Sequence, residues 1–270
     1  MLSTPIDARS LVGDSDILMV TLDTLRLDVA AEQMASGATP NLARLVGRWE
    51  HRHTPASFTY AAHLAFFAGF LPTPASPGPH PRLFAVKFAG SESTAETTAV
   101  FDAPDLVQGL RGAGYRTICI GGTGFFDPSS RLGQTLVGSF DEAHWSPELG
   151  VTARESTANQ VALACDRIAA HPDQRCFVFI NVSALHQPNC HYVPGRDVDD
   201  RETHAAALRY VDSQLPPLFE ALAGRGRALC IVTSDHGTAY GERGYVGHRC
   251  ALPEIWDVPY AEFVLEGGAR

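Results

Sequence analysis

Several features that would place a protein in a common class are missing from this 270-residue sequence. Basic residues number 21 against 30 acidic ones, and the resulting net charge of −9 argues against broad binding to nucleic acid or to anionic membranes. No run approaches the roughly 18 apolar residues of a transmembrane helix, so we expect no membrane span. The first residues show no basic segment followed by an apolar one, so we expect no secretory signal and a cytoplasmic location.

Paired cysteine motifs are also missing. The six cysteines are scattered, with no C-x-x-C pair, and are expected to be reduced thiols rather than a disulfide framework or a zinc cluster. Lysine is nearly absent, since Lys87 is the one lysine among 21 basic residues. Hydrophobic residues make up 45% of the chain, which suffices for one large core. We therefore expect a single domain over residues 1–270.

Short apolar runs without turn residues predict buried strands at 16–22, 176–182 and 229–233. Thr39 and Pro40 predict the start of a helix, as its N-cap and first residue. Further strands are expected at 117–120 and 258–265, and helices at 60–70, 106–111, 156–170 and 203–223, the last interrupted by two prolines. This alternation predicts an α/β fold with a mostly parallel central sheet and helices on both faces. Residues 73–100, rich in proline, glycine and serine, are expected to form a long loop near the functional site.

Three of the predicted strands end in residues that can carry chemistry. Asp23 follows the first strand, residues 183–186 follow another, and Asp235-His236-Gly237 follows a third. Ligands of open α/β sheets gather beyond the carboxyl ends of the strands, so these residues are expected to converge. A carboxylate beside an imidazole suits Mn²⁺ or Zn²⁺ better than Ca²⁺. The alternatives are a polar turn for Asp235-His236-Gly237 and a turn cap for Asp23.

A hydroxyl group stands at the start of the helix expected at 60–70. Thr59 directly precedes the apolar run, and a helix N-terminus stabilises an alkoxide or a developing anionic charge. The alternative is that Thr59 only caps the helix. His63 follows one turn later, either facing the same pocket or lying in the core or on the helix surface.

In their order and spacing, these motifs resemble the sulfatase-like branch of the alkaline phosphatase superfamily. More narrowly, the sequence is similar to a small bacterial group of sulfatase-like hydrolases with no assigned substrate. The resemblance implies an alkaline phosphatase-like fold that lacks the large C-terminal subdomain. The motifs that carry it are VTLDTLRLD at 20–28, TPNL at 39–42, the segment from Thr59 to Gly69 and Pro72, HQP at 186–188, and SDHG at 234–237.

The resemblance places Thr59 at the nucleophile position, ten residues before Gly69. Sulfatases carry a Cys or Ser there, which is converted to formylglycine, and threonine cannot undergo that conversion. Ala61, Ala62 and His63 also replace the Pro, Ser and Arg of the sulfatase motif. Because threonine nucleophiles occur in the phosphodiesterase and phosphoglycerol-transferase branches, the resemblance favours phosphoester chemistry over sulfate-ester chemistry.

The resemblance also implies a site for one or two divalent metal ions, with Mn or Zn favoured over Ca or Mg. Asp23, Asp235, His236 and the Thr59 oxygen are the implied ligands, while Thr24 replaces a second aspartate of the sulfatase site.

Further histidines and Lys87 complete the implied site. His248 is the first choice as ligand of a second ion, with His186 and then His191 to complete it. His186, His63 and Lys87 are implied substrate contacts. The D-x-x-x-H spacing of Asp200 and His204 is interpreted as a solvated surface, as is Asp212 on a helix.

The sequence therefore predicts a metal-dependent hydrolase or transferase acting on a small-molecule or lipid-like phosphoester. One alternative is a sulfate- or phosphonate-ester hydrolase. Another is a metal- or ligand-binding domain that inherited the fold without catalysis. A short chain with an open site could also borrow a wall from a second copy, so a homo-oligomer is a further expectation.

Overall fold

The computed structural model describes residues 6–69, 78–79, 84–85, 98–100 and 103–267. Within these ranges, seven strands form the central sheet in the order β2–β11–β8–β1–β7–β5–β6. Five neighbouring strands, β8, β1, β7, β5 and β6, run parallel. The strands are β1 (Asp16–Leu22), β2 (Glu50–His53), β5 (Arg116–Ile120), β6 (Glu142–His144), β7 (Cys176–Val182), β8 (Ala228–Thr233) and β11 (Asp257–Leu265).

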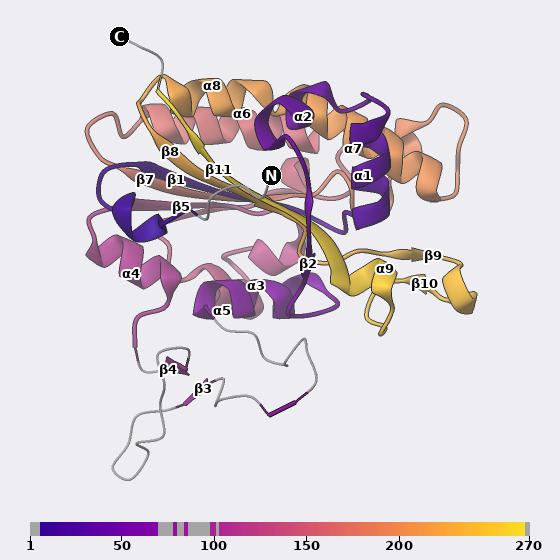
Figure 1. Ribbon diagram of the computed structural model, residues 1–270, viewed down its shortest axis with the longest axis horizontal. Coiled ribbons are helices and arrows are strands. Elements are labelled where there is room, and N and C mark those ends of the chain that lie inside the picture. Colours follow the sequence, from indigo (N-terminus) through magenta and orange to yellow (C-terminus); the bar gives the residue numbers. More distant parts are fainter. Residues whose placement is uncertain (1–5, 70–77, 80–83, 86–97, 101–102, 268–270) are drawn as a thin grey trace.

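Helices cover both faces of the sheet, which makes a three-layer molecule (Figure 1). One face packs against α1 (Leu27–Ala35), α2 (Pro40–Val46), α6 (Ser156–Ala169), α7 (Arg201–Gln214) and α8 (Pro216–Ala223). The other face packs against α3 (Thr59–Ala68), α4 (Leu106–Gly112) and α5 (Arg131–Val137).

The other elements of the described residues are short. They are α9 (Pro253–Trp256), β3 (Phe84–Ala85), β4 (Ala99–Val100), β9 (Ala239–Tyr240), β10 (Val246–Gly247) and the 3-10 turns η1 (Ala8–Ser10), η2 (Gly124–Phe126), η3 (Pro147–Leu149), η4 (Cys190–Tyr192) and η5 (Glu242–Gly244).

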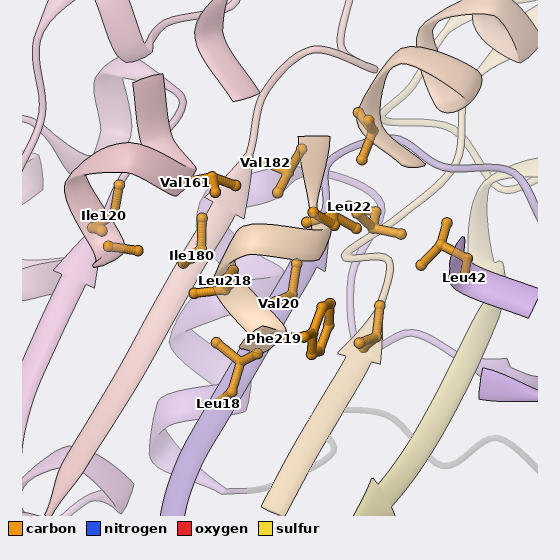
Figure 2. Close-up of a cluster of buried hydrophobic side chains, with 14 of the residues drawn as sticks. Leu18, Val20, Leu22, Leu42, Ile120, Val161, Ile180, Val182, Leu218 and Phe219 are labelled. Atoms are coloured by element: carbon orange, nitrogen blue, oxygen red, sulfur yellow. The ribbon is translucent and has the colours of Figure 1, made fainter. Parts of the chain in front are cut away.

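The central strands are buried along their whole length, as their apolar sequences predict. Alternate residues of β1 point to opposite faces, so Leu18, Val20 and Leu22 pack against one helical layer (Figure 2). Ile17 and Met19 pack against the other layer, beside Phe177 and Phe179. A continuous hydrophobic run is therefore what a strand buried on both faces requires.

Two strands of the sheet, β2 and β6, were not predicted from the sequence. β11, expected as a last strand, runs antiparallel to β8, and β2 pairs with β11 at the edge of the sheet. The sequence of β2 is Glu-His-Arg-His, and its three histidine and arginine side chains are exposed. Hydrophobic periodicity cannot identify such a strand, because its pairing comes from backbone hydrogen bonds rather than from burial of side chains.

The expectation that Asp212 lies on a helix surface is wrong. Its carboxylate is 2% exposed and accepts hydrogen bonds from the backbone nitrogens of Leu42 at 2.7 Å and Asn41 at 3.3 Å. Thr39 stands at the N-cap position of α2 as expected, but its side chain makes no capping hydrogen bond. An anion from α7 therefore satisfies the free N–H groups at the start of α2.

The interpretation of Asp200 and His204 as a solvated surface is wrong for His204, whereas the side chain of Asp200 is 38% exposed. His204 is fully buried, with Nδ1 2.8 Å from the hydroxyl of Tyr240. Asp200 instead caps α7 by accepting a hydrogen bond from the Thr203 nitrogen.

Most of the loop expected at 73–100 lies outside the described residues. No helix of the described residues is long and apolar enough to cross a membrane.

Candidate metal centre

The predicted convergence of Asp23, Asp235 and His236 is present. β1 and β8 are adjacent parallel strands, and the three residues follow their carboxyl ends. The backbone nitrogen of Asp23 donates to the carbonyl of Val182, which ties the residue to the end of β7 as well. The site therefore sits over the middle of the sheet, where three strands end side by side.

Gly237 is required by the close approach of α9. A Cβ atom at this position would lie 2.0 Å from the carbonyl oxygen of Glu254. The Gly237 nitrogen donates to the Ile255 carbonyl at 2.7 Å, which fixes the turn after His236. A glycine after the Asp-His pair thus lets the chain turn sharply while both side chains stay in the site.

Each of the three side chains offers one ligand atom, and all these atoms lie within 4.8 Å of one another. Nε2 of His236 is 3.5 Å from Oδ2 of Asp235 and 3.9 Å from Oδ1 of Asp23. The three residues are fully buried, and these two carboxylate oxygens have no hydrogen-bond partner. Buried carboxylate oxygens without partners call for a cation between them.

The remaining polar atoms of the cluster are occupied. Oδ2 of Asp23 accepts a hydrogen bond from Asn181 at 3.2 Å, and Oδ1 of Asp235 accepts from the backbone nitrogens of Thr24 and His236. Nδ1 of His236 lies 2.8 Å from the Gly237 carbonyl and donates its proton there. Its Nε2 is then left with a lone pair, which is the arrangement of a metal-binding histidine.

Burial controls the electrostatics of the cluster. It raises the pKa of Asp23 to about 6, with repulsion from Asp235 adding to the effect. Burial likewise raises the pKa of Asp235 to about 7 and lowers the pKa of His236. Two carboxylates and a neutral imidazole form a donor set that fits a divalent cation, which would remove the cost of ionising both acids side by side.

The side chain of Thr24 takes no part in the cluster. Its hydroxyl donates to the Leu185 carbonyl at 3.1 Å, so its side chain is directed to the backbone after β7. Thr24 stands where the resemblance to sulfatases implies a second carboxylate ligand. Its hydroxyl is used in a hydrogen bond to the backbone instead.

Thr59 lies beside the cluster, as the first residue of α3. Its Oγ1 is 3.3 Å from Nε2 of His236, and the side chain is 2% exposed. Phe58 occupies the N-cap position in an extended conformation and contributes no side-chain hydrogen bond. The Thr59 hydroxyl thus combines two favourable surroundings for an oxygen anion, a helix N-terminus and a candidate cation site.

His63 lies beneath Thr59 and does not line the cavity described below. Its Nδ1 is 2.7 Å from the Thr59 carbonyl, and its Nε2 is 2.9 Å from the hydroxyl of Thr21. The ring packs edge-on against Phe66, Phe126 and Phe179, and burial lowers its pKa to about 3. A neutral His63 therefore supports the backbone at Thr59 and has no free nitrogen for substrate.

Sequence reasoning missed two residues that link His63 to the cluster. Thr21 and Asn181 are register partners in β1 and β7, and Asn181 donates to Thr21 Oγ1 at 3.3 Å as well as to Asp23. Both are polar residues within otherwise apolar buried strands, which was the signal available in the sequence. Buried polar groups must be paired, and these two join the Thr59 segment to a metal-ligand candidate.

A cavity of about 830 Å³ opens at Thr59, and His186 and His248 also line it. The ring of His248 lies 4.6 Å from that of His236 and 5.5 Å from that of His186, measured between centroids. Nδ1 of His248 is buried without a hydrogen-bond partner, and burial lowers its pKa to about 3. The structure therefore brings both histidines to the space in front of Thr59.

One further described candidate is not brought to this cavity. His191 does not line it, and its ring packs on Tyr192 with centroids 4.3 Å apart. Lys87 lies outside the described residues.

No protein-family model and no curated protein matches the sequence. Many solved structures match the fold. The soluble domain of lipooligosaccharide phosphoethanolamine transferase A from Neisseria meningitidis is similar at a TM-score of 0.66 and 16% identity, covering 93% of this chain and 76% of that one. The lipoteichoic acid synthase LtaP from Listeria monocytogenes gives 0.60 and 12%, with coverages of 94% and 66%. A protein in the alkaline phosphatase superfamily from Vibrio parahaemolyticus gives 0.56 and 15%, with coverages of 92% and 60%.

These similarities show that the chain shares the fold of these structures, one of which is a protein in the alkaline phosphatase superfamily. They confirm the predicted α/β class with its mostly parallel sheet. At identities of 12–16% they establish the fold alone. The chain spans between 60% and 76% of the lengths of these three structures.

Proposed function

We propose that this protein is a metal-dependent phosphoester hydrolase or transferase with Thr59 as its nucleophile. One observation carries the proposal. Two partnerless carboxylate oxygens and an imidazole nitrogen converge in a fully buried cluster, and the Thr59 hydroxyl lies 3.3 Å from that nitrogen. A buried anionic cluster beside a helix N-terminal hydroxyl is costly to maintain unless it binds a cation and a substrate.

Asp23, Asp235 and His236 hold the cation in this proposal, together with the Thr59 oxygen. The mixture of carboxylate oxygens and an imidazole nitrogen favours Mn²⁺ or Zn²⁺ over Ca²⁺ or Mg²⁺. When bound, such a cation lowers the pKa of the Thr59 hydroxyl and offsets negative charge on the phosphorus oxygens. His248 and His186 are the candidates for a second ion.

The chain's own residues then account for the transfer. Oγ1 of Thr59 gives up its proton to solvent and attacks phosphorus, so that a new oxygen–phosphorus bond forms as the bond to the leaving oxygen breaks. The leaving oxygen then takes up a proton from water. The N-terminus of α3 stabilises the charge that develops there. In this proposal His186 and His248, which line the cavity at Thr59, hydrogen-bond the leaving oxygen or the phosphoryl group. Water, or an acceptor alcohol, then attacks the same phosphorus and releases Thr59.

A panel of p-nitrophenyl esters tests the proposal. Metal-loaded protein is assayed on a phosphate monoester, a phosphate diester, a phosphonate ester and a sulfate ester, each with Mn²⁺, Zn²⁺, Ca²⁺ or Mg²⁺. We expect a phosphoester to be the best substrate and Mn²⁺ or Zn²⁺ the best ion. Greater activity on the sulfate or the phosphonate ester would contradict the phosphoester as the substrate class and favour that ester instead. Metal binding without any turnover would support a non-catalytic domain.

Matched variants of the nucleophile sharpen this test. Thr59→Ala is expected to lose at least about a thousandfold in turnover while it keeps its metal, and Thr59→Ser should retain most of the activity because it keeps the hydroxyl. Full metal-dependent activity of Thr59→Ala on every substrate of the wild type would contradict the proposal.

Size-exclusion chromatography of the active protein decides whether the expected homo-oligomer forms.

A further inference from the structure

Polar and apolar side chains both line the cavity in front of Thr59. His186, His248 and Thr59 lie next to the metal candidates. Residues that follow β5 and β6 or begin α5 contribute the apolar side chains of Phe125, Leu132, Trp145, Pro147 and Val151, together with the hydroxyls of Thr123, Ser130 and Thr152. The cavity measures about 830 Å³, which is within the range of small-molecule sites.

The charged and amide groups of the cavity lining are few. Among the described residues that line the cavity, no side chain is a carboxylate or an amide. The charged residues are Arg131 and Arg249, both exposed. Leu132, at 53% exposure, belongs to the large hydrophobic side chains that remain in contact with solvent.

From this wall we infer the class of substrate: a phosphoester whose organic group is apolar, such as an alkyl chain, and lies along Phe125, Leu132, Trp145 and Val151. The inference rests on the proposed function, because it takes the phosphoryl group to lie at Thr59. Among the uncharged side chains of this part of the lining, a sugar or another polyhydroxylated group could hydrogen-bond only to the hydroxyls of Thr123, Ser130 and Thr152 and to Nε1 of Trp145. It would leave the apolar side chains without an apolar partner, and each of its own hydroxyls left unpaired reduces affinity. An alkyl group instead gains from every methylene that leaves water.

Alkylphosphonates provide a probe that does not depend on turnover. Methyl-, butyl- and octylphosphonate share one head group and differ only in the apolar chain. Binding to the metal-loaded protein is measured by calorimetry and by quenching of tryptophan fluorescence. We expect affinity to rise on the order of threefold per methylene until the chain fills the cavity.

Two leucine variants locate the binding surface. Leu132→Asn places an amide in the cavity wall and should flatten the dependence on chain length. Leu106→Asn is the matched control, because Leu106 is 41% exposed on α4 and does not line the cavity. Since both leucines are already partly exposed, neither change removes a buried core residue, and the thermal unfolding of each variant verifies that it is folded.

The outcomes separate the two proposals. Affinity that rises with chain length in the wild type and in Leu106→Asn, but not in Leu132→Asn, supports the apolar substrate class. Affinity independent of chain length, or tighter binding of glycerol phosphate than of octylphosphonate, overturns it even when esters are turned over. Chain-dependent binding without turnover of any ester leaves the apolar site standing and removes the proposed catalysis.

Discussion

Replacing Asp235 by Asn should stabilise the metal-free protein and abolish its stabilisation by metal. Asp235 is fully buried, and burial raises its pKa from the usual 3.8 to about 7. The folded state therefore binds this proton more tightly than the unfolded state does. Stability of the metal-free protein must fall as the pH rises from about 4 through 7. Asn carries no charge to desolvate, so this part of the pH dependence should disappear in the variant.

The magnitude follows from the two pKa values. At ~1.4 kcal/mol per pKa unit, the difference between 3.8 and about 7 makes Asp235→Asn more stable than the wild type by up to ~4 kcal/mol at pH 8. The Asn oxygen can still accept from the Thr24 and His236 nitrogens, and its NH₂ group can donate to Asp23 across the cluster. Metal at a hundred times its dissociation constant should stabilise only the wild type, by about 2.7 kcal/mol.

Thermal and urea unfolding at pH 5 and pH 8, with and without Mn²⁺ or Zn²⁺, measure both effects. For a chain of this size, ~1 kcal/mol corresponds to a change in Tm of roughly 2 °C. Asp14→Asn is the control, because Asp14 is an exposed carboxylate outside the candidate metal cluster. The reasoning is refuted if Asp235→Asn is the less stable protein at pH 8 without metal, or if metal still raises its Tm as it does for the wild type.

Three further predictions concern residues around the site and the core. His63→Gln should lower kcat by about ten- to a hundredfold with unchanged metal content, because His63 supports the Thr59 backbone. Steady-state kinetics together with metal analysis measures this effect. An unchanged kcat would contradict the positioning role of His63. Burial lowers the pKa of His204 to about 3, so the folded state resists protonation of this side chain. The stability of the protein should therefore fall as the pH decreases below about 6.5. In His204→Gln, the urea midpoints at pH 7 and pH 5 should differ less than they do in the wild type. In urea unfolding, Asp212→Ala should lower the free energy of unfolding by about 2–4 kcal/mol, because it leaves N–H groups of α2 unpaired. Asp212→Asn should lower it by less. Equal losses in the two variants would contradict the role of Asp212 as a hydrogen-bond acceptor.

The main strands and the central cluster could be predicted because both depend on local sequence and on one general rule. Apolar runs such as 176–182 identify strands buried on both faces. Parallel strands end at the same edge of a sheet, so Asp23 and Asp235 had to lie near each other once β1 and β8 were adjacent.

The partners of buried polar residues could not be predicted in this way. Asp212 and His204 lie on a helix with many charged residues, and only the packing of α7 against α2 and β9 shows that they are buried. His63 could equally have faced the cavity, since one helical turn fixes its distance from Thr59 but not the side on which the pocket lies. The apolar cavity wall comes from residues 122–152, which follow two different strands and show no common periodicity.

Identification of a covalent phosphoryl group on Thr59 tests the central claim most directly. Metal-loaded protein is mixed with the best p-nitrophenyl phosphoester, quenched in acid within the first turnovers, digested and analysed by mass spectrometry. The account predicts the added phosphoryl mass on Thr59 in the wild type, a burst of p-nitrophenol before the steady state, and neither in Thr59→Ala. Steady turnover by the wild type with the phosphoryl group on another residue, or with no burst and no modified peptide, would contradict it.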